Sequence, residues 1–379
     1  MRAFDKDLVL YLKQKGLVPE ALRRFLQKHI NVMELRAASW IAQDPFANDL
    51  SASTYESKYP HVLGIIKEFW HLHWHYIAAC RDVGVAYKVL DISGPDWQKV
   101  IETSGCDAFL VRPSVQVSIW KQMYDERLRI MTKDMGKIIF PSYDELWFWE
   151  SKRRMHYWLH ANDVPYPKTW IFYDRKAALR FAEQTPLPIV FKSDMGSGAT
   201  GVIIFRERSC LKKHILRCFG RGFTTYRKAP NDREWGNIFL QEYIENAREW
   251  RIIRIGESYF GYEKLMGRGF HSGSHRSRHG LPPADLLDLA QEVTDKGKFL
   301  SMDLDILVTP GTRPLVNELQ PIFGMEYTTE ACIVDGKTGR MLYDTTHNSW
   351  QFEAGSFCRN QLCNLRVIAL LETLGREHA

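Results

Sequence analysis

Short apolar runs alternate with helix-like segments between His61 and Pro141, and this alternation constrains the fold more than any other feature of the sequence. The apolar runs predict four strands, HVLGIIKE (61–68), YKVLDI (87–92), AFLVRP (108–113) and KIIFP (137–141). The stretches between them predict helices over 71–83, 96–104 and 117–135. Strands that alternate with helices are typical of a parallel α/β sheet. The lone glycines Gly84 and Gly94 do not form a dinucleotide-binding fingerprint.

The residues before this domain predict a helical arm over 5–30, with a break near Gly16 and Pro19, and then a loop over 42–60. The N-terminal apolar stretch carries charges throughout, which is unlike a signal peptide. No apolar run approaches the ~20 residues that a membrane span needs. Seven cysteines without a C-x-x-C pair indicate reduced thiols and a cytoplasmic protein.

Length and charge limit the function classes. At ~150 residues per domain, 379 residues predict two or three domains. The net charge of +6 comes from 51 basic and 45 acidic residues spread along the chain. Such a small excess accepts an anionic ligand but does not favour nucleic-acid binding.

Further along, strands and helices no longer alternate regularly. We expect a tryptophan-rich helix over 144–162, a helix over 175–184 and another over 209–219. The segment SDMGSGATG (193–201) separates the predicted strands 188–192 and 202–205. That order predicts a hairpin, because a P-loop would lead from a strand into a helix and carry G-K-[ST]. The remaining predicted elements are strands at 168–173, 238–244, 249–256, 259–265, 302–308 and 314–320, and helices at 284–298 and 357–374.

The last predicted hairpin carries a candidate metal site. Asp305 lies on one strand, and Glu318 follows thirteen residues later on the next strand. Gln320 shares the face of Glu318, because side chains two residues apart point to the same side of a strand. Two carboxylates and an amide oxygen suit Mg²⁺, whose coordination is usually completed by substrate phosphates. The alternative is a solvent-facing polar side of an ordinary antiparallel hairpin.

Two further segments suit a nucleotide. Lys192 ends an apolar strand directly before the glycine-rich loop, where it can meet a phosphate. Gly196, Gly198 and Gly201 allow a close approach of the backbone to a ligand, and Ser197 lies among them. The alternative is a surface lysine beside a flexible hairpin.

The segment QEYIENAREWR (241–251) supplies the third candidate group. A strand end with Glu242 that exposes the backbone of Tyr243 and Ile244 can pair with an adenine edge. Glu249 is placed to accept both ribose hydroxyls. Arg251 shares the face of Glu249, Lys264 comes from the next strand, and both can hold a γ-phosphate or an acyl phosphate.

From about residue 141 to 325, this ordered set resembles the ATP-grasp superfamily of carboxylate–amine ligases. It is similar to the group of D-alanine–D-alanine ligase, glutathione synthetase and the ribosomal-protein glutamate ligase. The features that carry the resemblance are, in chain order, Lys152, Lys192 before SDMGSGATGV, QEYI, Glu249, Asp305 and the Glu-Leu-Gln of 318–320. One position departs from the family pattern, since Gln320 stands where the family usually has asparagine.

The resemblance implies an α/β and α+β chain with an ATP-grasp fold of two α+β subdomains. After the helical arm and loop (1–60), it implies a small parallel α/β domain (61–141), a lid subdomain (142–240) and a large subdomain with the metal site (241–379). ATP would lie between the subdomains, with one or two Mg²⁺ or Mn²⁺ ions on Asp305, Glu318 and Gln320. Lys152 and Lys192 would hold the α- and β-phosphates, and Arg251 and Lys264 the transferring phosphoryl group.

The implied reaction is ATP-dependent activation of a carboxylate as an acyl phosphate, followed by amide formation with an amine. The carboxylate can belong to a small molecule, a peptide or a sugar acid, and the family is often dimeric. A phosphotransferase and a non-catalytic ATP sensor remain the alternatives. Arg268, Arg276 and Arg278 form a basic loop that either contacts substrate or is solvated. His71 and His75 have zinc-like spacing, but a packed or substrate-facing helix explains them better.

Overall fold

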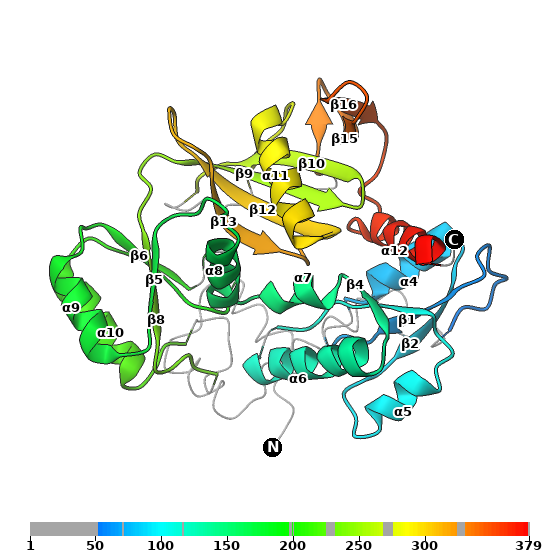
Figure 1. Cartoon of the computed structure of the whole chain (residues 1–379), viewed down its shortest axis with the longest axis horizontal. Helices are drawn as coiled ribbons and strands as arrows, with labels where there is room; N and C mark the ends of the chain where they lie inside the picture. The colour runs from blue at the N-terminus through cyan, green and yellow to red at the C-terminus, as the bar shows by residue number, and fades with distance from the viewer. Residues whose placement is uncertain are drawn as a thin grey trace, which may run out of the picture.

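The computed structural model describes residues 52–69, 72–115, 117–196, 199, 201–224, 232–267, 276–323 and 330–377. Within these ranges the chain forms one parallel and two largely antiparallel sheets, with helices packed around them (Figure 1). The predicted helical arm over 5–30 lies outside the described residues. None of the described helices is long and apolar enough to cross a membrane.

The first sheet confirms the predicted parallel α/β arrangement. Its strands are β1 (Val62–Ile66), β2 (Ala86–Leu90), β3 (Ala108–Leu110) and β4 (Ile138–Phe140), in the spatial order β2-β1-β3-β4. All neighbouring pairs are parallel. The connecting helices are α4 (Trp74–Val83), α5 (Trp97–Glu102) and α6 (Ser118–Arg129), and α6 continues into a π-helical turn over Ile130–Asp134. Since β2 and β3 flank β1 on opposite sides, the strand order reverses beside β1.

The prediction of one tryptophan-rich helix over 144–162 is wrong. The segment forms α7 (Tyr143–Phe148) and α8 (Lys152–Ala161). Between them Glu150 adopts a positive φ of 53°, which a helix does not tolerate. The Glu150 side chain accepts a hydrogen bond from Gly196 N at 2.9 Å. This contact with a distant loop accompanies the break, and Lys152 consequently lies at the start of a new helix.

The second sheet has the order β5-β8-β6-β7 and is antiparallel. Its strands are β5 (Thr169–Phe172), β6 (Ile189–Lys192), β7 (Val202–Phe205) and β8 (Ile238–Glu242). The helices α9 (Arg175–Gln184) and α10 (Arg208–Phe219) bury Ala178, Ala182, Leu211 and Ile215 against it. The pairing of β6 with β7 confirms the predicted hairpin around the glycine-rich loop.

The third sheet has eight strands in the described residues and is built around β9, β10, β12 and β13. Its strands are β9 (Arg248–Ile255), β10 (Ser258–Lys264), β11 (Ser277–Arg278), β12 (Ser301–Val308), β13 (Leu315–Gln320), β14 (Ile333–Val334), β15 (Lys337–Asp344) and β16 (Ser349–Ala354). The helix α11 (Ala284–Gly297) packs against it through Leu286, Leu287, Ala290 and Val293. The sequence did not predict β14, β15 and β16, whose side chains are mostly half-buried or exposed.

The last helix, α12 (Cys363–Glu377), packs on the first sheet's helix α4 (Figure 1). Val367, Leu370 and Leu374 of α12 share an apolar cluster with Tyr76 and Ala79 of α4. Because α12 follows the last strand of the third sheet and packs on α4, it connects the third sheet to the parallel domain. The predicted helix over 357–374 starts six residues later than expected, at Cys363.

Candidate functional site

One face of the third sheet carries a row of charged and polar side chains. In the strand register, Glu318 of β13 lies opposite Asp305 of β12, and Asp305 lies opposite Arg251 of β9. Side chains two residues apart share this face. The complete row, from β13 across to β10, is Gln320, Glu318, Asp303, Asp305, Arg251, Glu249 and Lys264. The sheet thus brings together all the predicted residues that come from its strands.

Asp305 is the centre of a buried ion-pair network. Arg251 donates to it through Nε at 2.9 Å from Oδ1 and through Nη2 at 3.0 Å from Oδ2. Lys264 Nζ lies 2.7 Å from Asp305 Oδ2 and also contacts Glu249 Oε1. Burial acts to raise the pKa of Asp305, but the two cations outweigh it and hold that pKa well below its usual range. Asp305 is therefore a carboxylate at any ordinary pH.

Asp303 is a member of the row that the sequence interpretation missed. It is fully buried, and its Oδ2 lies 3.3 Å from Arg251 Nη1. Neither carboxylate oxygen has a hydrogen-bond partner in the described part of the chain. Burial raises its pKa well above the usual value, and neighbouring Asp305 adds to that effect, although Arg251 opposes it. The signal was present, because residues 303 and 305 of one strand must share a face.

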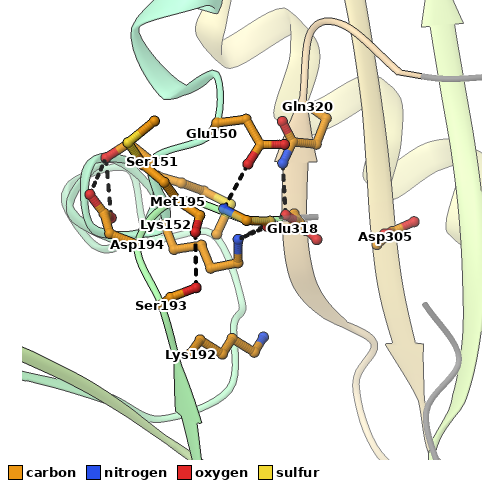
Figure 2. Close-up of polar contacts among 12 residues, drawn as sticks. Glu150, Ser151, Lys152, Lys192, Ser193, Asp194, Met195, Asp305, Glu318 and Gln320 are labelled. Carbon is orange, nitrogen blue, oxygen red and sulfur yellow. Dashed lines mark hydrogen bonds and ion pairs between the residues drawn. The ribbon is translucent and has the colours of Figure 1, made fainter. Parts of the chain in front are cut away.

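Two lysines face this row from the second sheet and α8 (Figure 2). Lys152, in the first turn of α8, places Nζ 3.5 Å from Glu318 Oε1 and donates to Gly196 O at 2.8 Å. Lys192, the last residue of β6, donates to Asn317 Oδ1 at 2.7 Å. Residues that are 166 positions apart, Lys152 and Glu318, thereby meet where the two sheets approach each other.

A β-bulge explains how Asn317 reaches Lys192. Asp305 pairs with Glu318, but the next residue of β12, Ile306, pairs with Val316, so Asn317 is an extra residue in β13. A bulge re-aims a side chain and is common beside active sites. Without it, Asn317 and Glu318 would point to opposite faces of the sheet. The alternation of the sequence does not reveal the bulge, and Asn317 was consequently not predicted.

The glycine-rich loop is closed at its base by Ser193 N, which donates to Gly201 O at 2.9 Å. Gly196 contacts two side chains near the start of α8. Its N–H donates to Glu150, which the sequence analysis did not single out, and its C=O accepts from Lys152. Asp194 anchors the loop to α8 by accepting from Arg153 N at 2.8 Å and Arg153 Nη2 at 2.9 Å. Ser197 and Gly198 lie outside the described residues.

The predicted adenine-binding segment follows β8. Glu242 is the last residue of that strand, and its Oε1 accepts from Lys168 N at 2.6 Å. Tyr243 and Ile244 are half-buried and follow directly, with the Tyr243 ring 5.6 Å from the Arg206 guanidinium carbon. This segment joins the second sheet to the third, and it leads into Glu249 of the charged row.

Arg278 of the basic loop and His75 of the histidine pair do not join the row. Arg278 pairs with Glu263 at 3.3 Å, and Glu263 points to the opposite face of β10 from Lys264. Arg276 is exposed, and Arg268 and His71 lie outside the described residues. Among the described residues, no group of three or more His, Cys, Asp or Glu side chains could hold a metal ion.

The predicted magnesium ligands, by contrast, form a mixed set of two carboxylates and one amide. Glu318 and Asp305 are direct cross-strand neighbours, and Gln320 Nε2 donates to Glu318 Oε1 at 2.7 Å. That bond leaves Gln320 Oε1 buried with no hydrogen-bond partner in the described part of the chain. An orphaned acceptor beside two carboxylates fits a hard cation that prefers oxygen.

Lys192 gives a pH-dependent prediction. Burial lowers its pKa to about 8, and Lys152 adds to the lowering, although Glu318 opposes it. If Lys192 binds phosphate as a cation, affinity for MgATP is present below that pKa and is lost as the pH rises through it, by up to about tenfold per pH unit. Calorimetric titrations of the protein with MgATP from about pH 7 to about pH 10 measure this loss of affinity. The variant Lys192→Met should bind weakly without that slope, and a flat wild-type profile would contradict the role.

Comparison with solved structures gives several that share this architecture at low sequence identity. D-cycloserine synthetase DcsG is 18% identical, with a TM-score of 0.52 over 83% of this chain and 99% of that one. D-alanine–D-alanine ligase from Bacillus anthracis is 12% identical, with a TM-score of 0.51 over 84% of this chain and 100% of that one. The biotin carboxylase domain of 2-oxoglutarate carboxylase from Hydrogenobacter thermophilus, solved with MgADP, is 13% identical, with a TM-score of 0.53 over 70% of this chain and 65% of that one.

No protein-family model matches the chain, and no curated protein matches it by sequence. The structural similarity therefore identifies the fold and nothing beyond it. It agrees with the parallel first sheet and the two largely antiparallel sheets that follow. The chain has the ATP-grasp fold.

Proposed function

We propose that this protein is an ATP-dependent ligase that activates a carboxylate as an acyl phosphate and joins it to an amine. The observation that carries the proposal is the approach of Lys152 from α8 and Lys192 from the second sheet to the third sheet. They reach Glu318 and Asn317 there, beside Asp305 and Gln320. Cations from one side and carboxylates from the other suit a metal-bound triphosphate. Two of the structural neighbours are themselves named as a ligase and a synthetase.

In this proposal Lys152 and Lys192 hold the α- and β-phosphates of ATP, and Glu242, Tyr243, Ile244 and Glu249 hold the adenosine. Asp305, Glu318 and Gln320 are the magnesium ligands. A magnesium ion bound there would neutralise charge on the β- and γ-phosphates. Gly196, Ser197, Gly198 and Gly201 belong to the loop that covers the phosphates. Arg251 and Lys264 lie on the same face and stabilise the transferring phosphoryl group.

The reaction needs little covalent work from the protein. A carboxylate oxygen of the acid attacks the γ-phosphorus, the bond to the bridging oxygen breaks, and ADP leaves. The amine nitrogen then attacks the acyl carbon, which releases inorganic phosphate and one proton. Catalysis comes from positioning and from charge stabilisation, for which Arg251 and Lys264 are already preorganised in their ion pairs.

An ADP-release assay with MgATP and a panel of acids crossed with amines tests the proposal. We expect release that requires both an acid and an amine, together with formation of the amide, detected by mass spectrometry. Release with an acid alone and a stable phosphorylated product would instead identify a phosphotransferase. Binding of MgATP without any release across the panel would indicate a sensor, and absence of MgATP binding would rule out all three.

A further inference from the structure

Two neighbouring arginines, the buried Arg366 and the half-buried Arg112, lie outside the site described above. Arg366, in the first turn of α12, is only 2% exposed. Its Nε donates to Ser301 Oγ at 3.1 Å and its Nη1 to Gln361 O at 3.2 Å, whereas Nη2 is buried and has no hydrogen-bond partner among the described residues. The guanidinium also stacks on the Phe323 ring, 4.5 Å from its centre. These contacts fix the orientation of Arg366, but none of them comes from a carboxylate.

Arg112 belongs to the same cluster. It follows β3, and its Nη1 lies 3.4 Å from Gln361 Oε1, so both guanidinium groups contact the same residue. Gln361 is held there by three consecutive non-glycine residues with positive φ, at 49°, 55° and 65° for 360–362. A left-handed turn of that kind is strained and persists only where the surroundings enforce it.

No carboxylate neutralises these two arginines in the part of the chain that the structure describes. The nearby acids are committed elsewhere: Glu145 accepts from the N–H groups of Leu300 and Ser301, and Asp82 pairs with Arg359. His75 of α4 adds no further positive charge, because burial and the two arginines lower its pKa to about 3 and leave it neutral. A buried cation without a counter-charge is strongly unfavourable, and such groups are found paired or occupied by a ligand.

The position of the cluster is one where α/β sheets bind ligands. Arg112 lies beyond the carboxyl end of β3, and α4 begins beyond the carboxyl end of the neighbouring β1. The strand order β2-β1-β3-β4 reverses between β1 and β3. Ligands of open parallel sheets bind outside the carboxyl ends of the strands at such a reversal.

The cluster also continues the polar row of the third sheet. Ser301, which Arg366 contacts, lies on the same face of β12 as Asp303 and Asp305. Four residues of strand separate Ser301 from Asp305, which is roughly 14 Å at the usual rise per residue. A γ-phosphate at the Asp305 end and a short acid that reaches the Ser301 end can span this distance.

We propose that Arg366 and Arg112 bind a second oxyanion group of the acid that is activated, so that the acid substrate is a dianion. The inference rests on the proposed ligase function and specifies its substrate class. The first carboxylate of the acid lies toward Arg251 and Lys264, where it would be phosphorylated. The second anionic group, a carboxylate or a phosphate, accepts hydrogen bonds from Arg366 Nη2 and from the guanidinium of Arg112.

The test measures binding of acids by calorimetry to the full-length protein with MgADP present. The probes are succinate, glutarate and adipate, the monocarboxylates of matched chain length, and 3-phosphoglycerate as a phosphorylated acid. We expect at least one dianion to bind at least about tenfold more tightly than its monoanionic counterpart, as charge-assisted bonds to arginine predict. Whichever binds more tightly, a dicarboxylate or the phosphorylated acid, identifies the second anionic group as a carboxylate or a phosphate.

Three variants make the test specific. Arg112→Gln, a partly exposed position, should abolish the preference for the dianion, and Arg366→Lys should reduce it while keeping a positive charge. Arg359→Gln is the matched control, because this arginine directly precedes the left-handed turn 360–362 but is exposed and paired with Asp82. MgADP affinity should stay unchanged in all three.

Two outcomes with the wild type distinguish this inference from the proposed function on which it rests. If the wild type binds MgADP but binds dianions and monoanions equally, this inference alone is overturned. If the wild type does not bind MgADP, the proposed ligase function is overturned.

Discussion

Asp305→Leu is expected to lower the free energy of unfolding by about 3–5 kcal/mol and to abolish acid-dependent ADP release. The stability loss follows from the network around Asp305, which is fully buried and accepts both arms of Arg251 as well as Lys264. Removing one partner of a buried ion pair leaves the other charges uncompensated in a low-dielectric interior. Arg251 would then keep its ion pair with Asp303, and Lys264 its ion pair with Glu249.

Urea unfolding followed by circular dichroism measures this change. The double variant Asp305→Leu/Arg251→Met provides the internal check, because it removes a cation together with its carboxylate. It should recover part of the lost stability, since apolar residues often replace a buried ion pair at little cost. An unfolding midpoint of Asp305→Leu equal to that of the wild type would show that the network does not stabilise the fold.

Glu318→Gln is expected to lower acid-dependent ADP release by at least about 10³-fold, equivalent to about 4 kcal/mol of transition-state stabilisation. The fold should stay intact, with a stability change of about 1 kcal/mol. Glu318 is partly exposed, with 18% of its side chain accessible, and its ion pair with Lys152 is long at 3.5 Å. A glutamine keeps the shape and can still accept from Gln320 Nε2, but it loses the charge that a magnesium ligand needs.

Steady-state ADP release and urea unfolding, performed on the same preparation, separate these two effects. Glu353→Gln is a suitable control, since Glu353 is a half-exposed strand glutamate paired with Arg340 on β15. It should leave both measurements unchanged. Turnover by Glu318→Gln within tenfold of the wild type would contradict its role as a metal ligand. Comparison with Asp305→Leu would separate loss of metal binding alone from loss of metal binding together with loss of stability.

The sequence predicted much of the site because strand alternation is a local property. Asp305, Glu318 and Gln320 were assigned to one face from their spacing, and the register places Asp305 directly opposite Glu318. The same alternation placed Glu249 and Arg251 together, and it could have added Asp303. Asn317 escaped because a single inserted residue changes which side chains face the site, and no local pattern in PLVNELQ marks it.

The fold was predicted where periodicity is strong. The parallel domain and the glycine-loop hairpin have clear apolar runs, and the structure confirms both. The break between α7 and α8 was missed because helical periodicity continues through Trp149–Ser151, whereas the break involves a contact of Glu150 with Gly196, 46 residues away. Strands β14–β16 were missed because they bury little apolar surface and therefore show weak patterning.

The sequence by itself determined which residue types lie on which strand face, and hence that carboxylates, lysines and a glycine-rich loop occur in the order of an ATP-grasp chain. Only the tertiary structure decided which of them meet. Lys152 reaches Glu318, and Arg366 reaches Ser301, because separate sheets and helices pack together, which sets distances between residues far apart in the chain. Spacing along a strand fixes the direction of side chains over a few residues. Burial and ion pairing, and the burial of Arg366 without a carboxylate partner among the described residues, arise only when distant segments exclude water together.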